Sequence, residues 1–113
     1  MDCVFCKIAR GEIASSIMYR DDRVLVIEDL NPQAPVHLLA LPVEHYATLG
    51  DLVAAGRNDV AEALLRAAAA QGAQRGGAGG YRLVVNTGAD GGQTVGHVHA
   101  HVLAGRPMQW PPG

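Results

Sequence analysis

Residues 96–105 read GHVHAHVLAG and place His97, His99 and His101 at every second position. Side chains alternate between the two faces of a β-strand, so a strand here points all three imidazoles to one side. Neighbouring rings in such a row are roughly 6–7 Å apart, since a strand rises about 3.3 Å per residue. The apolar residues between and after them point the other way, toward a core: Val98, Ala100 and Val102. We therefore predict a strand over 97–105 that presents a row of histidines.

A row of imidazoles is compatible with three roles. A solvated polar face is one, although long arginines or lysines would serve equally well there. A metal site is the second, because a catalytic zinc usually takes three protein ligands. Such a site normally enlists a carboxylate, and the nearest acid, Asp90, lies back in the preceding loop. The third role is attack on phosphorus by the central imidazole, a good nucleophile near neutral pH that needs no metal.

The loop before the histidines, NTGADGGQTVG at residues 86–96, lacks the Gly-Lys-Ser/Thr of a Walker A motif. Its glycines, Gly88 and Gly91–Gly92, allow backbone N–H groups to approach an anion closely. Asn86, Gln93 and Thr94 add neutral hydrogen-bonding groups. A plain hairpin loop remains an alternative. Beside the histidine row, however, the loop favours a phosphate pocket built without lysine.

The rest of the chain predicts an antiparallel α+β fold in one domain, residues 1–113. We expect a short helix at 3–11 with Val4, Phe5 and Ile8 on one side, ended by Gly11. Strands are expected on either side of the turn at 21–23, at 36–42 and at 81–86. A single helix is expected from about 51 to 75, with one buried stripe. That stripe is predicted to contain Val60, Leu64 and Leu65.

Composition limits the possible partners and compartments. The formal net charge of −2 over 113 residues gives no general attraction to nucleic acid or to an anionic membrane. No apolar run approaches the ~20 residues that a membrane span needs. The first ten residues lack the blocks of a signal peptide, so a cytoplasmic location is expected. Two cysteines are too few for a secreted disulfide framework.

The motif HVHAHVL resembles the signature of the histidine triad superfamily, in which histidine and apolar residues alternate. Further segments agree in the same order: DCVFCKIARGEI, YRDDRVLVIEDLNPQAPVHLLALPVEH, GYRLVVNTGADGGQTVGHVHAHVLAGR and the terminal WPPG. The DGGQTVGHVH loop and the WPPG ending are similar to the Hint-like, purine-nucleotide-binding branch. The resemblance implies a five-stranded antiparallel sheet with two helices per subunit. It also implies a homodimer that joins two such sheets into ten strands, with Trp110 reaching toward the partner's site.

The resemblance further implies hydrolysis of purine nucleoside 5′-phosphoramidates, such as AMP linked to an amine or to lysine. By this likeness His99 becomes transiently nucleotidylated, His101 contacts the phosphate, and His37 and His97 support their orientation. Thr94 would donate toward the leaving amine, and Asp29 would bind the ribose hydroxyls. Asp29 could instead cap its turn through an Asx-type bond. The remaining residues with an implied nucleotide contact are Asn86, Gly92 and Gln93 for the phosphate and Val4, Phe5, Ile8, Ile27 and Leu30 for the purine.

Two alternative functions remain open at this point. One is a dinucleoside polyphosphate hydrolase, which the Trp-Pro-Pro-Gly tail disfavours. The other is a nucleotide-binding regulatory or adaptor protein that acts through partner binding. For the hydrolase that acts through His99, no cofactor is expected to be required for catalysis.

The cysteines raise the separate question of a metal. A Cys-x-x-Cys motif indicates zinc when a second ligand pair is available, and His45 and His97 are candidates beside Cys3 and Cys6. The alternative is two partly buried thiols on a short helix in a reducing compartment. If zinc binds, its role is structural, because Cys₂His₂ ligation leaves no open position for water.

Overall fold

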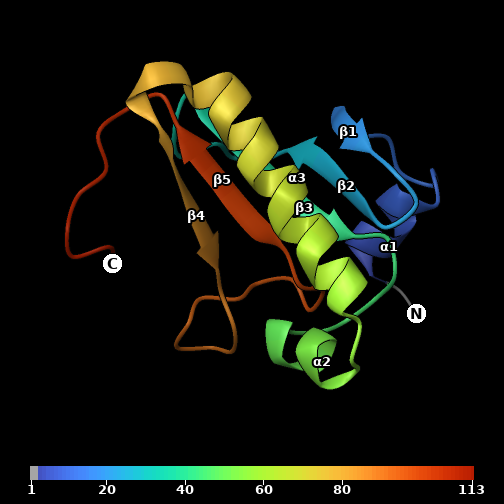
Figure 1. Cartoon of the computed structure of the whole chain (residues 1–113). Coiled ribbons are helices and arrows are strands. Elements are labelled where there is room, and N and C mark those ends of the chain that lie inside the picture. The colour runs from blue at the N-terminus through green and yellow to red at the C-terminus, as the bar shows by residue number, and fades with distance from the viewer. Residues whose placement is uncertain (1–2) are drawn as a thin grey trace.

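The computed structural model describes residues 3–113. Its centre is a five-stranded antiparallel sheet with the strand order β1-β2-β3-β5-β4 (Figure 1). The strands are β1 (Ile17–Arg20), β2 (Val24–Glu28), β3 (Val36–Pro42), β4 (Tyr81–Val85) and β5 (Ala100–Ala104). The helices are α1 (Val4–Ala9), α2 (Leu49–Ala54), α3 (Asn58–Gly76) and the short 3₁₀ helix η1 (Gly77–Gly79). The antiparallel sheet predicted from the sequence is therefore confirmed.

The two faces of the sheet carry separate apolar cores, because both faces are covered by helix. Figure 1 shows α3 lying across one face, where Val24 and Val26 of β2 pack against the helix. Leu25 and Ile27, the alternate residues of the same strand, pack with Phe5 of α1 on the opposite face. This explains why β2 is a continuous apolar run rather than an alternating one.

The helical region differs from the single helix expected over 51–75. It is divided into α2 and α3 by residues 55–57, where Gly56 adopts a φ of 72° that an α-helix does not allow. Together with α1 this gives three α-helices in residues 3–113, rather than the two that the family resemblance implies. No helix of residues 3–113 is long and apolar enough to cross a membrane.

The buried stripe of α3 also differs at one position. Val60 and Leu64 are each 1% exposed as expected, but Leu65 is 56% exposed. Leu65 follows Leu64 by one residue, a rotation of about 100° that turns it away from the sheet. The stripe continues instead through small residues, Ala67, Ala68 and Gly72, which let the helix lie close to the strands.

The strand expected over 97–105 is shorter than predicted, since β5 begins at Ala100. Residues 97–99 leave the ladder, and the Val98 N–H donates to the carbonyl of Tyr46 at 2.7 Å. The alternation of faces nevertheless continues through this segment. Val98 and Ala100 lie in the core beneath α3, while the histidines point to the side of α1.

Candidate active site

The three histidines form a row on the α1 side of the sheet. Phe5 of α1 packs edge-on against two of them, with ring centroids 5.8 Å from His97 and 5.1 Å from His99. The rings of His99 and His101 are 5.0 Å apart, closer than an ideal strand predicts, because they tilt at 59° to one another. His97 is fully buried, whereas His99 is 6% exposed and borders a cavity.

The hydrogen bond of His99 shows which of its ring nitrogens keeps a free lone pair. Its Nδ1 lies 2.8 Å from the backbone carbonyl oxygen of His97, which can only accept a proton. Neutral His99 therefore carries its proton on Nδ1 and keeps a lone pair on Nε2. None of the described residues forms a hydrogen bond with this Nε2, and no buried polar side-chain atom among them lacks a partner. The Nε2 atom is thus accessible, as a nucleophile must be.

His101 is supported by a second histidine, His37 of β3. Nε2 of His37 lies 2.9 Å from Nδ1 of His101 and 3.3 Å from a carboxylate oxygen of Asp29. Burial lowers the pKa of His101 below its ordinary value of 6.5, and the neighbouring His99 and His37 lower it further. His101 is therefore neutral near pH 7 and donates from one ring nitrogen only.

A cavity of about 310 Å³ opens in front of His99 and His101. One wall is apolar and holds all five residues expected at the purine: Val4, Phe5, Ile8, Ile27 and Leu30. Asp29 and Thr94 also line it, so the structure brings these expected contacts together around the two histidines. Leu30 is 98% exposed and lies at the rim.

Several residues lining the cavity were missed from the sequence. They are Ile13, Ala14, Ser15, Glu28, Leu39 and Val95. Leu39 could have been found, because it is the cross-strand partner of His101 and thus shares its face. Residues 13–15 could not be predicted to line the cavity, because they belong to an irregular segment whose position depends on tertiary packing.

Asp29 combines the two roles considered from the sequence. One carboxylate oxygen accepts the N–H of Asn31 at 2.8 Å, which is the Asx-type turn. The other oxygen faces His37 and borders the cavity. The turn therefore fixes the carboxylate in place without using its second oxygen.

Three residues expected at the phosphate belong to the glycine loop before β5. Asn86, Gly92 and Gln93 do not line the cavity. The Gln93 amide nitrogen donates to the carbonyls of Ala47 at 2.7 Å and Val95 at 3.0 Å. Its oxygen accepts the Gly88 N–H at 3.2 Å. Gln93 thus holds the loop together, and its polar groups are already occupied.

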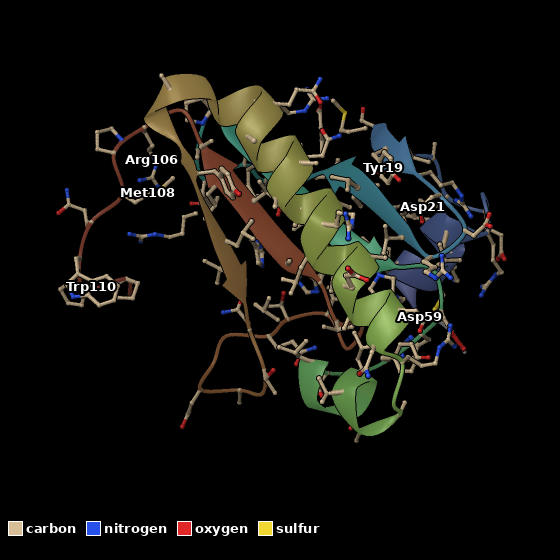
Figure 2. The ribbon with its side chains drawn as sticks, in the orientation of Figure 1. Tyr19, Asp21, Asp59, Arg106, Met108 and Trp110 are labelled. Atoms are coloured by element: carbon tan, nitrogen blue, oxygen red, sulfur yellow. The ribbon has the colours of Figure 1, made fainter. Side chains whose placement is uncertain are left out.

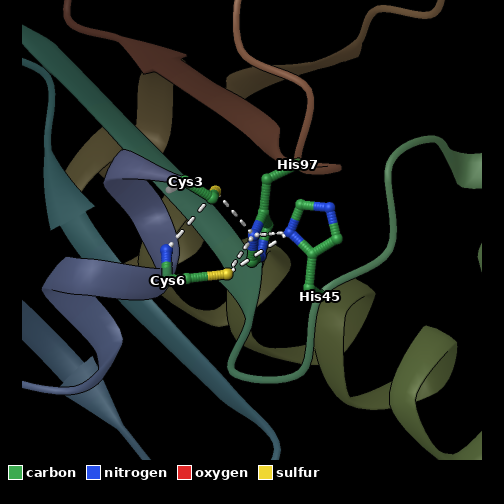
Figure 3. Close-up of side chains that lie close together, drawn as sticks. All are labelled: Cys3, Cys6, His45 and His97. Atoms are coloured by element: carbon green, nitrogen blue, oxygen red, sulfur yellow. Dashed lines mark hydrogen bonds between the residues drawn. The ribbon is translucent and has the colours of Figure 1, made fainter. Parts of the chain in front are cut away.

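Cys3, Cys6, His45 and His97 converge beside the histidine row (Figure 3). Nδ1 of His97 lies 3.4 Å from Sγ of Cys3, 3.5 Å from Sγ of Cys6 and 3.1 Å from Nδ1 of His45. Tetrahedral zinc with ordinary bond lengths requires about 3.6 Å between sulfur and nitrogen and about 3.3 Å between two nitrogens. The distances from His97 are therefore close to those of a tetrahedral zinc site, and all four ligand atoms lie within 4.8 Å of one another.

Protonation agrees with a metal site. Nε2 of His97 lies 2.8 Å from the carbonyl of Pro42, so its proton is on Nε2 and the Nδ1 lone pair faces the cysteines. Burial lowers the pKa of His97, which keeps the ring in its neutral, ligating form. Burial, with a contribution from Cys3, raises the pKa of the Cys6 thiol, so a metal must displace its proton.

A larger cavity, about 470 Å³, lies between α3 and the hairpin of β1 and β2, where Figure 2 labels Tyr19, Asp21 and Asp59. Its charged groups satisfy one another: the Tyr19 hydroxyl donates to Asp21 at 2.7 Å, and Arg23 pairs with Asp59 at 3.1 Å. It lies on the face of the sheet opposite the histidines. We therefore place the active site at the smaller cavity.

The antiparallel sheet and its histidine row define a class of α+β proteins that present a row of imidazoles on one sheet face. The model of the HIT domain family matches residues 10–108, and the chain belongs to this family. It is 46% identical over 112 residues to an uncharacterised HIT-like protein of Synechococcus elongatus, covering 99% of this chain and 97% of that one. A 14 kDa zinc-binding protein of Zea mays is 42% identical, covering 97% and 87%.

A solved structure supports the same fold. The HIT family hydrolase from Legionella pneumophila Philadelphia 1 superposes with a TM-score of 0.90 at 45% identity. The match covers 99% of this chain and 100% of that one.

Proposed function

We propose that this protein is a hydrolase that cleaves the P–N bond of purine nucleoside 5′-phosphoramidates through a nucleotidyl-histidine intermediate on His99. The observation that carries the proposal is the hydrogen bond from His99 Nδ1 to the His97 carbonyl. It leaves the Nε2 lone pair free at a cavity with an apolar wall and a carboxylate. The solved HIT family hydrolases with this fold support the reaction class.

The nucleoside would occupy the apolar part of the cavity. A purine stacks well between aliphatic and aromatic side chains, which Phe5, Ile8 and Ile27 supply. The Asp29 oxygen that borders the cavity beside His37 would accept hydrogen bonds from the ribose hydroxyls. The α-phosphate would then lie against His99 and His101.

The reaction would proceed in two displacements. In the first, Nε2 of His99 forms a bond to the α-phosphorus while the P–N bond breaks, and the leaving amine takes up a proton. His101 and Thr94 both line the cavity, and one of them would supply that proton. The nucleotidylated ring is then an imidazolium, whose charge the His97 carbonyl stabilises through the Nδ1–H bond.

In the second displacement, water attacks phosphorus, gives a proton back to the group that protonated the amine, and the bond to Nε2 breaks. The nucleoside monophosphate leaves, and His99 returns to its neutral form. No step needs a metal. The Cys3, Cys6, His45 and His97 cluster would hold a structural zinc, which the zinc-binding relatives support.

The proposal includes a homodimer. β4 is an edge strand, so its outer backbone groups are free to pair with a second copy and extend the sheet to ten strands. Trp110 is 83% exposed on the C-terminal tail, as a residue that contacts a partner would be. Light scattering coupled to size-exclusion chromatography tests this: a monomer at micromolar concentration would contradict it.

The activity is tested with a fluorogenic adenosine 5′-phosphoramidate. The wild-type protein should turn it over without added metal, and His99→Asn should reduce kcat by about 10⁴-fold or more, as removal of a covalent nucleophile does. Asp90→Asn, a change in the same loop region but outside the cavity, is the matched control and should leave kcat unchanged. AMP binding, measured by calorimetry, should survive in His99→Asn. Full turnover in His99→Asn would refute the mechanism.

A further inference from the structure

We propose that Gln33 is a positioning residue, whose backbone N–H fixes which ring nitrogen of His101 carries the proton, and that Arg106 holds Gln33 for this task. The proposal rests on the proposed function, in which His101 contacts the transferred phosphate. It concerns Gln33, in the loop before β3, and Arg106, two residues to which neither the sequence motif nor the cavity assigned a role.

The first step is the hydrogen bond from Gln33 to His37. The Gln33 backbone N–H lies 3.0 Å from Nδ1 of His37. A backbone amide can only donate, so this Nδ1 must be an acceptor. Neutral His37 therefore carries its proton on Nε2.

In the second step, the tautomer of His37 determines the tautomer of His101. Nε2 of His37 faces Nδ1 of His101 at 2.9 Å and donates its proton there. Nδ1 of His101 is then an acceptor, so neutral His101 carries its proton on Nε2. The two rings at the cavity thus have opposite tautomers: His99 offers a lone pair on Nε2, and His101 offers an N–H on Nε2.

The same reasoning gives a role to Asp29 beside His37. Asp29, His37 and His101 are close enough together to hold a metal ion. Nε2 of His37, however, carries a proton and has no lone pair for a metal. The carboxylate oxygen 3.3 Å away stabilises that proton instead. These three residues therefore fix the positions of ring protons rather than bind a metal.

Among residues 3–113, His37 is the residue whose side chain forms a hydrogen bond with a ring nitrogen of His101. The titratable side chains that face it are His99, His37 and Asp29. Its cross-strand partners on β3 and β4 are Leu39 and Val84, both apolar. The position of the His101 proton thus depends on the series of hydrogen bonds that starts at the Gln33 N–H.

Arg106 holds Gln33, the first residue of this hydrogen-bond series, in place. Its Nε donates to the Gln33 carbonyl at 3.0 Å, and its Nη1 donates to the Pro107 carbonyl at 3.1 Å. The Gln33 side chain adds a bond from its amide to the Asn31 carbonyl at 3.0 Å. Figure 2 shows Arg106 at the beginning of the C-terminal tail, near Met108. The tail therefore braces the loop from outside.

The tautomers can be observed directly, without any substitution. Long-range ¹H–¹⁵N correlation spectra of ¹⁵N-histidine-labelled protein at pH 7.5 distinguish protonated from unprotonated ring nitrogens. We expect protonated Nε2 in His37 and His101 and protonated Nδ1 in His99. A His101 ring protonated on Nδ1 would overturn the proposal, and it would do so whether or not the protein hydrolyses a phosphoramidate.

Variants test the consequence for catalysis. Gln33→Pro removes the N–H, while the control Gln33→Ala keeps it and loses only the side chain. We expect Gln33→Pro to lower kcat by about 10–100-fold with little change in KM and to give mixed His101 tautomers, since proton donation is worth about 10²–10⁴ in rate. Gln33→Ala should retain kcat and the wild-type spectrum.

Arg106 gives a second route in case the proline disrupts the loop. Arg106→Met should reproduce the mixed tautomers and the loss in kcat, and Arg106→Lys should restore both, because an ammonium group also donates to a carbonyl. Wild-type tautomers and kcat in Arg106→Met would remove Arg106 from the proposal, and the same result in a folded Gln33→Pro would overturn it.

Discussion

Zinc binding should stabilise this protein by several kcal/mol, and Cys6→Ser should abolish that gain. The four ligand atoms already lie within 4.8 Å of one another, so the metal binds the folded state with little reorganisation. A ligand at 1,000 times its Kd that binds only the folded state stabilises it by about 4.1 kcal/mol. For a domain of this size, about 1 kcal/mol corresponds to roughly 4 °C in Tm. The expected increase is therefore about 15 °C.

The assay is differential scanning calorimetry of chelator-treated protein at buffered free zinc concentrations. Wild-type protein should show the increase in Tm, and Cys6→Ser should not. The control is His37→Gln, which removes a histidine outside the cluster and should keep the full increase. An unchanged Tm in the wild type, or an equal increase in Cys6→Ser, would refute the reasoning.

The zinc-induced increase in Tm should also become larger as the pH rises. Burial raises the pKa of the Cys6 thiol, so the metal-free protein holds a proton there that zinc must displace. The pKa of His97 is lowered, so this ring is already deprotonated at neutral pH and contributes no released proton. The zinc-induced shift in Tm should therefore grow as pH rises from 6 to about 8, since thiolate ligation releases protons. A shift that is constant over this range would contradict the assignment of Cys6 as a ligand.

Three further predictions concern the site and the fold. Because burial lowers the pKa of His101 below 6.5, kcat/KM should stay constant down to that pH and fall only below it; a midpoint above 6.5 would contradict a neutral donor. Gln93→Leu should lower the free energy of unfolding in urea by about 2–3 kcal/mol, from three hydrogen bonds at about 1 kcal/mol each; unchanged stability with a raised KM would instead support a phosphate contact. Gly72→Ala should destabilise by about 1–3 kcal/mol, because an added Cβ would lie 2.5 Å from the Tyr81 ring; a more stable variant would show that the ring moves aside.

Much of the fold could be predicted from local pattern. The strands β1 and β2 on either side of the turn at 21–23, the strand β3 and the strand β4 follow from apolar runs and turn residues. The division of the long helix at Gly56 was missed, because a single glycine is also tolerated within a helix. The exposure of Leu65 was missed for a related reason: apolar character alone does not say which side of a helix faces the sheet.

For the site, residue spacing predicted which side chains share a face, but it did not predict which groups they form hydrogen bonds with. Alternation placed His97, His99 and His101 on one side correctly, even though β5 begins only at Ala100. The bonds of Gln93 could not be predicted, because its partner Ala47 is 46 residues away and is reached only through the packing of α2 and its preceding loop. The same holds for Gln33, whose importance comes from a backbone atom that no side-chain motif records.

The sequence by itself determined a histidine row on one face of an antiparallel sheet, because the period of two in a strand is a local property of the backbone. Only the tertiary structure decided the protonation of that row. A tautomer depends on which donor or acceptor meets each ring nitrogen, and those partners, the carbonyls of His97 and Pro42 and the N–H of Gln33, are placed by the folded backbone. For His97 and His101 these partners are distant in sequence, since the Pro42 carbonyl lies 55 residues from His97 and His37 lies 64 residues from His101, so their tautomers could be assigned only from the folded structure.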